Sequence, residues 1–316
     1  MDGAPDILAH IGRTPLVPLV HIGRGNRVAV LVKCEHLNPG GSVKDRIAKA
    51  IVDDAEGRGV LRPGMTLIEA TAGNTGIGLA LVAAARGYQL VCVMPEKMSV
   101  DKRVALVSLG ARVIITPNAP PSSPESFRNV AERMAAEHGW FLTDQFRNPA
   151  NIRVHEETTG AEILAQTNGT VSAFVAGAGT GGTSTGVGRS LKAARPGVRV
   201  VLADPIGSSL ADWVERGQPG PDGSYAVEGI GASEPPANLC RDVLDGVERV
   251  SDEESFAMVR RLVRDEGLLV GGSAGTNVVA ALRLAAQGGL DGPVVTVLPD
   301  AWDRYRTTAW MRGWAP

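Results

Sequence analysis

Cysteine and histidine are scarce in this 316-residue chain, and neither is spaced for cross-linking or metal binding. The three cysteines, Cys34, Cys92 and Cys240, form no CxxC pair, and their odd number argues against a disulfide framework. We expect them to pack in the interior, as free cysteines commonly do. The five histidines are scattered without the pairing of a zinc site, so the sequence predicts no metal.

Long apolar runs and runs of one charge are also absent. The longest apolar stretches, such as residues 79–85, are far shorter than the roughly 20 residues that cross a bilayer. The first residues are not a basic and then apolar leader, so we expect a cytoplasmic protein with no membrane partner. The net charge is -2 and no basic run is interleaved with aromatic residues, which favours small-molecule chemistry over a nucleic-acid partner.

What the sequence does contain is an alternation of short β-branched runs with helical patterns. Strands are expected at residues 28–32, 66–69, 90–94, 112–115, 171–176, 198–203 and 294–298. Helices are expected at residues 42–58, after 74, after 99 and at 253–266. This alternation predicts parallel sheets flanked by helices. Two segments rich in proline or glycine, residues 117–124 and 218–224, predict surface loops.

The first of several glycine-rich turns reads NPGGSVKDR at residues 38–46. It leads into an expected helix, and Ser42 and Asp45 have the spacing of a capping box. Lys44 would then lie in the first helical turn, where the helix dipole disfavours a cation and enlarges the neutral, nucleophilic fraction of the lysine.

The second turn reads EATAGNTG at residues 69–76, between a strand pattern and a helix. Its backbone N–H groups and hydroxyls could bind a carboxylate at the helix N-terminus. The alternative is a tight structural turn with Asn74 in a left-handed conformation. The two interpretations are compatible.

Two further turns lie in the second half of the chain. The run AGAGTGGT at residues 176–183 would let backbone amides approach a phosphate closely. A dinucleotide site is a rival interpretation, which Asp204 fits only loosely as the acidic residue about 20 positions on. The run GGSAGTN at residues 271–277 follows a strand-like run at 268–270, and its Ser273 could be a helix N-cap.

Together these motifs resemble the fold type II family of pyridoxal-phosphate (PLP) enzymes, the cystathionine β-synthase and cysteine synthase family, and most closely the cystathionine β-synthase catalytic core. The resemblance runs nearly end to end. Besides the four turns, it rests on IGRTPL at residues 11–16, VMPEKMS at 93–99, SPES at 123–126, DQFRNP at 144–149, EGIG at 228–231 and LPD at 298–300.

The resemblance implies a role for each matching residue. Lys44 would be the Schiff-base lysine, Asn74 the partner of the PLP 3′-oxygen, and Ser273 the partner of the pyridine nitrogen. The phosphate would be held by Gly179, Thr180, Gly181, Gly182 and Thr183. The substrate would be bound by Thr71, Ala72, Gly73, Thr75, Gln145 and Gly229.

The family fold consists of two doubly wound α/β domains, of the tryptophan synthase β type, with the cofactor in the cleft between them. The resemblance places residues 1–12 and 35–148 in a small N-terminal domain, and residues 13–34 and 149–316 in a large C-terminal domain. It also implies a homodimer. The implied reaction is β-replacement on L-serine or an O-activated L-serine through an aminoacrylate, with Lys44 as general base.

Departures from the family pattern leave the second substrate open. Ala72 stands where most relatives carry serine, ASEPP at residues 232–236 replaces an aromatic-containing segment, and His155-Glu156 replaces a His-Tyr pair. The leading hypothesis is replacement by a thiol amino acid, homocysteine giving cystathionine. Alternatives are sulfide, as in cysteine synthase and supported by Ala232, or an amine in specialised metabolism. A dehydratase and a non-catalytic protein that kept the fold are further alternatives.

Overall fold

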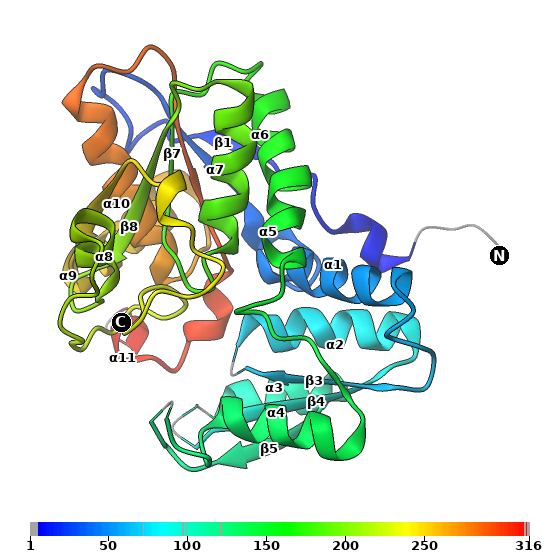
Figure 1. The fold of residues 1–316 in the computed structure, drawn as a ribbon. Coiled ribbons are helices and arrows are strands. Elements are labelled where there is room, and N and C mark those ends of the chain that lie inside the picture. Colours follow the sequence, from blue (N-terminus) through cyan, green and yellow to red (C-terminus); the bar gives the residue numbers. More distant parts are fainter. Residues whose placement is uncertain are drawn as a thin grey trace. The chain divides into compact units, whose positions relative to one another are not determined.

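The structure is a computed structural model that describes residues 6–71, 73–96, 98, 100–120, 122–312 and 314, with the backbone alone at Asp101. The chain divides into two compact units (Figure 1). Unit 1 comprises Met1–Ile11 and Asn38–Ala150, and unit 2 comprises Gly12–Leu37 and Asn151–Pro316.

Unit 1 contains a four-stranded parallel sheet with the strand order β5-β4-β3-β6. Its strands are β3 (Thr66–Ala70), β4 (Gln89–Pro95), β5 (Arg112–Thr116) and β6 (Phe141–Leu142). Its helices are η1 (Ile7–His10), α1 (Lys44–Gly57), α2 (Asn74–Arg86), α3 (Val100–Ser108) and α4 (Phe127–His138). The first strand, β3, is central, and later strands are added on both sides of it, which makes the sheet doubly wound.

Both faces of this sheet are covered, because successive side chains on a strand point to opposite sides. Leu67 of β3 packs in one core cluster with residues of α1, α2 and α3. The next residue, Ile68, packs in a second cluster with residues of α4. The strands therefore read as continuous apolar runs, as is usual for parallel sheets.

Unit 2 contains a six-stranded sheet with the order β1-β2-β10-β7-β8-β9, parallel except for the β1–β2 pair. Its strands are β1 (Leu16–Pro18), β2 (Val30–Lys33), β7 (Ala173–Ala176), β8 (Arg199–Pro205), β9 (Gly246–Val250) and β10 (Val294–Val297). Its main helices are α5 (Ala150–Val154), α6 (Ala161–Gln166), α7 (Gly182–Ala194), α8 (Leu210–Arg216), α9 (Asp252–Glu266), α10 (Gly272–Gln287) and α11 (Ala309–Arg312). Shorter helical segments are η2 (Glu35–Leu37), the π-helix η3 (His155–Gly160), η4 (Arg241–Val243) and η5 (Trp302–Tyr305).

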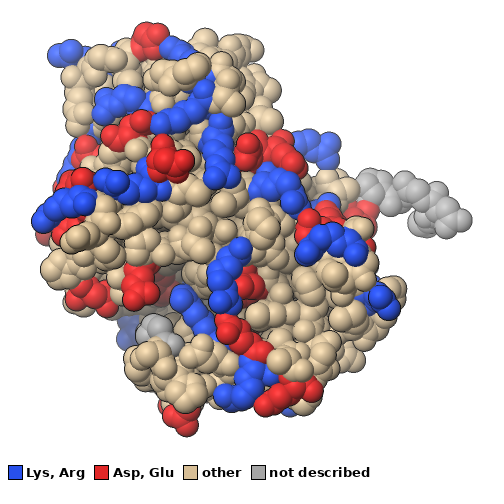
Figure 2. Space-filling model, in the orientation of Figure 1, with Lys and Arg blue, Asp and Glu red and all other residues tan. Residues whose placement is uncertain are grey.

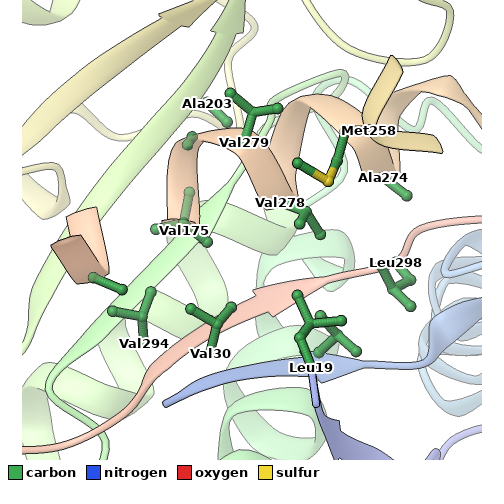
Figure 3. Packing of buried hydrophobic residues seen from close by; sticks show 14 of the residues in the cluster. Leu19, Val30, Val175, Ala203, Met258, Ala274, Val278, Val279, Val294 and Leu298 are labelled. Carbon is green, nitrogen blue, oxygen red and sulfur yellow. The ribbon is translucent and has the colours of Figure 1, made fainter. Parts of the chain in front are cut away.

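The core of unit 2 is built around α10, which is buried on most of its surface. Val278 and Val279 of α10 lie close to Val175 of β7 and Ala203 of β8 (Figure 3). On the opposite face of the sheet, Phe174 packs in a cluster with residues of α6 and α7. The sheet of unit 2 is thus covered by helices on both faces.

The predicted doubly wound α/β class is confirmed, and the expected strands occur within one or two residues of their predicted positions. One expectation about the strands is wrong. The strand-like run at residues 268–270 forms only an isolated bridge between Val270 and Ala301. Its apolar residues lead into the buried helix α10, and a short apolar run does not by itself distinguish a strand from such a segment.

The surface carries both signs of charge. On the face shown in Figure 2, lysine and arginine lie among aspartate and glutamate within each unit instead of forming a patch of one sign. In the described part of the chain, no helix is long and apolar enough to cross a membrane. The same residues contain no group of three or more His, Cys, Asp or Glu that could hold a metal ion.

Candidate functional site

The predicted substrate loops of unit 1 lie at neighbouring strand ends. Residues 71–73 follow β3, and residues 143–149 follow β6, which pairs with β3. The strand order reverses at this pair, and ligands of doubly wound sheets bind beside such strand ends. The sheet topology therefore brings together two motifs about 70 residues apart.

A hydrogen bond joins the two loops directly. The Thr75 hydroxyl donates to Oε1 of Gln145 across 2.6 Å, and both side chains are buried. Within the first loop, the backbone N–H of Gly73 donates to Oγ1 of Thr71 at 3.3 Å. Hydroxyl and amide groups thus lie at the start of α2, where the helix dipole favours an anion. Ala72 lies outside the described residues.

Beneath these loops lies a carboxylate that the sequence motif contained but to which no role was assigned. Glu69 is fully buried, and its Oε2 accepts hydrogen bonds from the Thr143 hydroxyl and from the Gln145 backbone N–H at 3.1 Å. Burial raises the pKa of Glu69 from its ordinary value of 4.5 to about 7, although both hydrogen bonds oppose the shift. Glu69 thereby fixes the backbone that carries Gln145.

Lys44 is the first residue of α1, so its predicted place in the first helical turn is confirmed. The capping box expected at Ser42 and Asp45 is wrong. Val43 is the N-cap without a side-chain bond, and the Asp45 carboxylate accepts from the Gly40 backbone N–H at 2.6 Å. The Ser42 hydroxyl instead accepts from the Lys44 backbone N–H at 3.2 Å.

Asn74 is the first residue of α2 and has no positive φ, so the left-handed alternative is wrong. The N-cap position that precedes it is occupied by Gly73. Helices α1 and α2 approach closely where they begin. A Cβ atom at Gly78 would lie 3.1 Å from the Lys44 carbonyl oxygen.

In unit 2, the predicted phosphate loop follows β7 and ends at the N-terminus of α7. Gly181 has a φ of +86°, which favours glycine. Glycines also permit close packing around the loop. A Cβ at Gly179 would overlap the Gly229 carbonyl oxygen, one at Gly182 would overlap the Asn151 side chain, and one at Gly181 would lie 2.5 Å from Leu239. The backbone amides therefore line a turn whose close packing only glycine allows.

The structure places Gly229 against the phosphate loop, as the overlap at Gly179 shows. The loop is also tied to the next segment, because the Gly231 N–H donates to the Ala178 carbonyl at 2.9 Å. Glu234, three residues further on, is exposed.

Ser273 is the second residue of α10 and is buried. The N-cap interpretation of Ser273 is wrong, because the cap position belongs to Gly271. One turn later, Oδ1 of Asn277 accepts from the Gly177 N–H at 2.7 Å, and its Nδ2 donates to the Val297 carbonyl at 2.9 Å. Asn277 therefore links the start of α10 to the phosphate loop and to β10.

The rival dinucleotide interpretation depended on Asp204. Its side chain is fully buried, and Oδ2 accepts from the Ala211 backbone N–H at 2.8 Å. Burial raises the pKa of Asp204 to about 6. The Asp204 carboxylate is therefore buried within the protein and is not accessible to the ribose hydroxyl of a bound dinucleotide.

Sequence reasoning missed the side chains behind the loops: Glu69, Thr143, Asn151, His155 and Asn277. A charged residue within an apolar strand pattern was the one available signal, at Glu69. The others are ordinary polar residues, and the partners that connect them to the loops are distant in the sequence.

Comparison with known proteins agrees with this arrangement. The chain belongs to the family described as "Pyridoxal-phosphate dependent enzyme", which it matches over residues 7–300. Members of this family are PLP-dependent, and the predicted cofactor is confirmed at this level.

Among its relatives, cystathionine beta-synthase from Apis mellifera is 46% identical over 96% of the chain. Cysteine synthase from Staphylococcus aureus is 43% identical over 94% of both proteins. The chain spans 60% of the length of the Apis mellifera protein and 55% of a similar protein from Oryctolagus cuniculus.

Among solved structures, O-ureido-L-serine synthase matches with a TM-score of 0.89 and 40% identity over 98% of this chain and 96% of that one. A lysine-to-alanine variant of that enzyme with O-ureido-L-serine bound matches with a TM-score of 0.87.

Proposed function

We propose that the protein catalyses PLP-dependent β-replacement on L-serine or an O-activated L-serine, with a thiol amino acid as the leading second substrate. The observation that carries the proposal is the Thr75–Gln145 hydrogen bond, because it supports a substrate carboxylate site next to the helix that begins at Lys44. The identities with cystathionine beta-synthase and cysteine synthase support the same reaction type.

The residues of unit 2 suit the phosphate and ring of PLP. The loop at Gly179–Thr183 has positions where a Cβ would clash, which leaves backbone N–H groups free to approach a phosphate at the start of α7. Ser273, buried at the start of α10, would bind the pyridine nitrogen. A neutral hydroxyl does not hold that nitrogen protonated as a carboxylate would.

The residues of unit 1 suit the amino-acid substrate. Thr71, the Gln145 side-chain amide that Thr75 orients, and the backbone amides of the second turn, including that of Thr75, would bind its carboxylate, while Asn74 would bind the PLP 3′-oxygen. PLP, when bound, withdraws electrons from the substrate and so weakens the Cα–H bond and the bond to the β-substituent. Lys44 would anchor the cofactor, and its freed Nζ would take the Cα proton and later return it.

Sulfide is the second candidate nucleophile. It is favoured by the match to cysteine synthase over 94% of both proteins, whereas the chain matches only part of the cystathionine beta-synthases. An oxygen or nitrogen nucleophile is the third candidate, since a solved neighbour is named for O-ureido-L-serine, a serine derivative substituted on the side-chain oxygen.

Turnover measurements separate these candidates. The PLP-loaded protein is incubated with L-serine, O-acetyl-L-serine or O-phospho-L-serine, each with homocysteine, sulfide or hydroxyurea, and products are identified by mass spectrometry. Cystathionine as the main product supports the proposal. Activity confined to sulfide contradicts the thiol amino acid, and keto acid formed without any acceptor indicates a dehydratase.

We also propose that the two units correspond to the small and large domains of the family, and that the protein is a cytoplasmic homodimer. The dimer follows from the resemblance alone. Size-exclusion chromatography with light scattering tests it, and the mass of a single 33.0 kDa chain at micromolar concentration would refute it.

A further inference from the structure

Behind the phosphate loop, a second set of side chains contacts its two threonines. Nδ2 of Asn151 donates to Oγ1 of Thr180 at 3.0 Å. Nε2 of His155 lies 3.2 Å from Oγ1 of Thr183, and its Nδ1 lies 2.9 Å from Oγ1 of Thr159. Asn151, His155 and Thr159 are all buried.

The helix geometry explains why these three residues share a face. Residues 150–166 form one continuous helical run, in which α5 passes into the π-helix η3 and then into α6. In an α-helix, residues four apart are separated by slightly more than one full turn, so their angular positions around the axis shift in one direction. A π turn contains more residues, so four residues make slightly less than one turn and the shift is partly reversed. Asn151, His155 and Thr159 are therefore presented to the same side, and single π turns often occur at functional sites.

Glycines hold this helical run close to α7. A Cβ at Gly186 would overlap the Ile152 carbonyl, and a Cβ at Gly160 would overlap the Ser190 side chain. The two backbones can approach only because both positions lack side chains. The contacts from Asn151 and His155 to the loop are thus set by backbone packing and do not depend on long, mobile side chains.

We propose that Asn151 and His155 are positioning residues that orient the Thr180 and Thr183 hydroxyls for the phosphate group of PLP. The inference rests on the proposed use of PLP. A phosphate dianion has only acceptor oxygens, so both hydroxyls must offer it their hydrogens. The lone pairs of each threonine oxygen then remain to accept a hydrogen bond from behind, which the Asn151 amide supplies for Thr180 and which fixes the direction of its O–H.

The same requirement assigns the tautomer of His155. Nε2 carries the hydrogen and donates to Thr183, while Nδ1 accepts from the Thr159 hydroxyl. In the opposite tautomer, Thr183 would donate to the imidazole and present only lone pairs toward a dianion. The pair Thr159–His155 therefore acts through Thr183 and not on the substrate.

The test compares the dissociation constants of PLP and of pyridoxal, which lacks the phosphate, for the apo form of the full chain. His155→Phe is expected to weaken PLP binding by about 10- to 100-fold, the range for one charge-assisted hydrogen bond, and to change pyridoxal binding less than about twofold. His155→Gln, which can still donate near the Nε2 position, is expected to recover most of the PLP affinity.

Thr158→Val is the matched control, because Thr158 lies on the same π-helix and its hydroxyl donates to the Val154 carbonyl at 2.5 Å. It is expected to leave the ratio of the two dissociation constants unchanged. Equal weakening of PLP and pyridoxal by His155→Phe would overturn the proposal, as would the same selective loss in Thr158→Val.

If His155→Phe does not fold, Asn151→Ala gives the same comparison through Thr180, and an unselective loss there overturns the proposal equally. The proposed reaction is tested separately. Wild-type protein that binds PLP but forms no replacement product contradicts the function and leaves the positioning roles intact, whereas wild-type protein that cannot bind PLP contradicts both.

Discussion

The Thr75 hydroxyl donates to Oε1 of Gln145 across 2.6 Å and so joins the loops that follow β3 and β6. This contact holds the Gln145 amide in a defined orientation at the end of the sheet. A side chain fixed in this way loses little conformational freedom when it binds a ligand, which favours a role in substrate positioning.

Gln145→Ala is expected to lower kcat/KM for the amino-acid substrate by about 10- to 100-fold, mainly through KM, because one hydrogen bond to a charged group is lost. The absorbance of bound PLP should not change. Steady-state kinetics measures the effect, and the exposed Gln287→Ala serves as control. An unchanged KM would contradict a role in carboxylate binding.

Glu69 makes stability depend on pH. Its pKa is raised from 4.5 to about 7 by burial, so between these values the unfolded chain loses the proton while the folded protein keeps it. The free energy of unfolding should therefore fall as pH rises from 4.5 to 7, by roughly 3 kcal/mol in total, and remain at the lower value above 7.

Urea unfolding at several pH values measures this contribution as the difference between wild type and Glu69→Gln. The variant keeps an oxygen acceptor for the Thr143 hydroxyl and the Gln145 N–H but cannot ionise. Glu137→Gln on the exposed face of α4 is the control. Identical pH profiles for wild type and Glu69→Gln would show that the Glu69 carboxyl titrates normally.

Lys33 is a fully buried cation, and its Nζ donates to Glu162 at 2.6 Å, to Gln166 at 2.9 Å and to the Thr14 carbonyl at 2.7 Å. Lys33→Met would remove the charged donor that these three acceptors share. We expect a loss of about 3–5 kcal/mol in the free energy of unfolding.

Lys192→Met tests the same substitution at a partly exposed pair, in which Lys192 and Asp245 lie 2.8 Å apart. A loss below about 1 kcal/mol is expected there, since solvent screens the interaction. Chemical denaturation measures both variants, and equal losses would argue against a special contribution from the Lys33 cluster.

The cysteines should differ in reactivity. Burial raises the pKa of the Cys34 thiol to about 11 and that of Cys92 to about 12, so neither supplies thiolate near neutral pH. Cys240 is partly exposed. Titration of the folded protein with a disulfide reagent, followed by peptide mapping, should label Cys240 first. Early labelling of Cys92 without unfolding would contradict its buried position.

The sequence predicted the α/β class and the order of its elements because these follow from local periodicity. Lys44 and Ser273 were correctly placed near helix starts, since glycine turns mark those starts. The capping box at Ser42 failed because Asp45 found another backbone partner, Gly40, which spacing alone could not indicate. The left-handed Asn74 failed because Asn74 is already the first helical residue of α2, with Gly73 as its N-cap.

By itself, the sequence determined the family, the parallel sheets and the chemistry-bearing motifs, because residue identity, spacing and apolar patterning are local properties of the chain. Only the tertiary structure decided which side chains support those motifs. Glu69 behind Gln145, and Asn151 and His155 behind the phosphate loop, are placed by strand order and by glycine contacts between helices, and hydrogen bonds form between groups that folding brings within 3 Å or so.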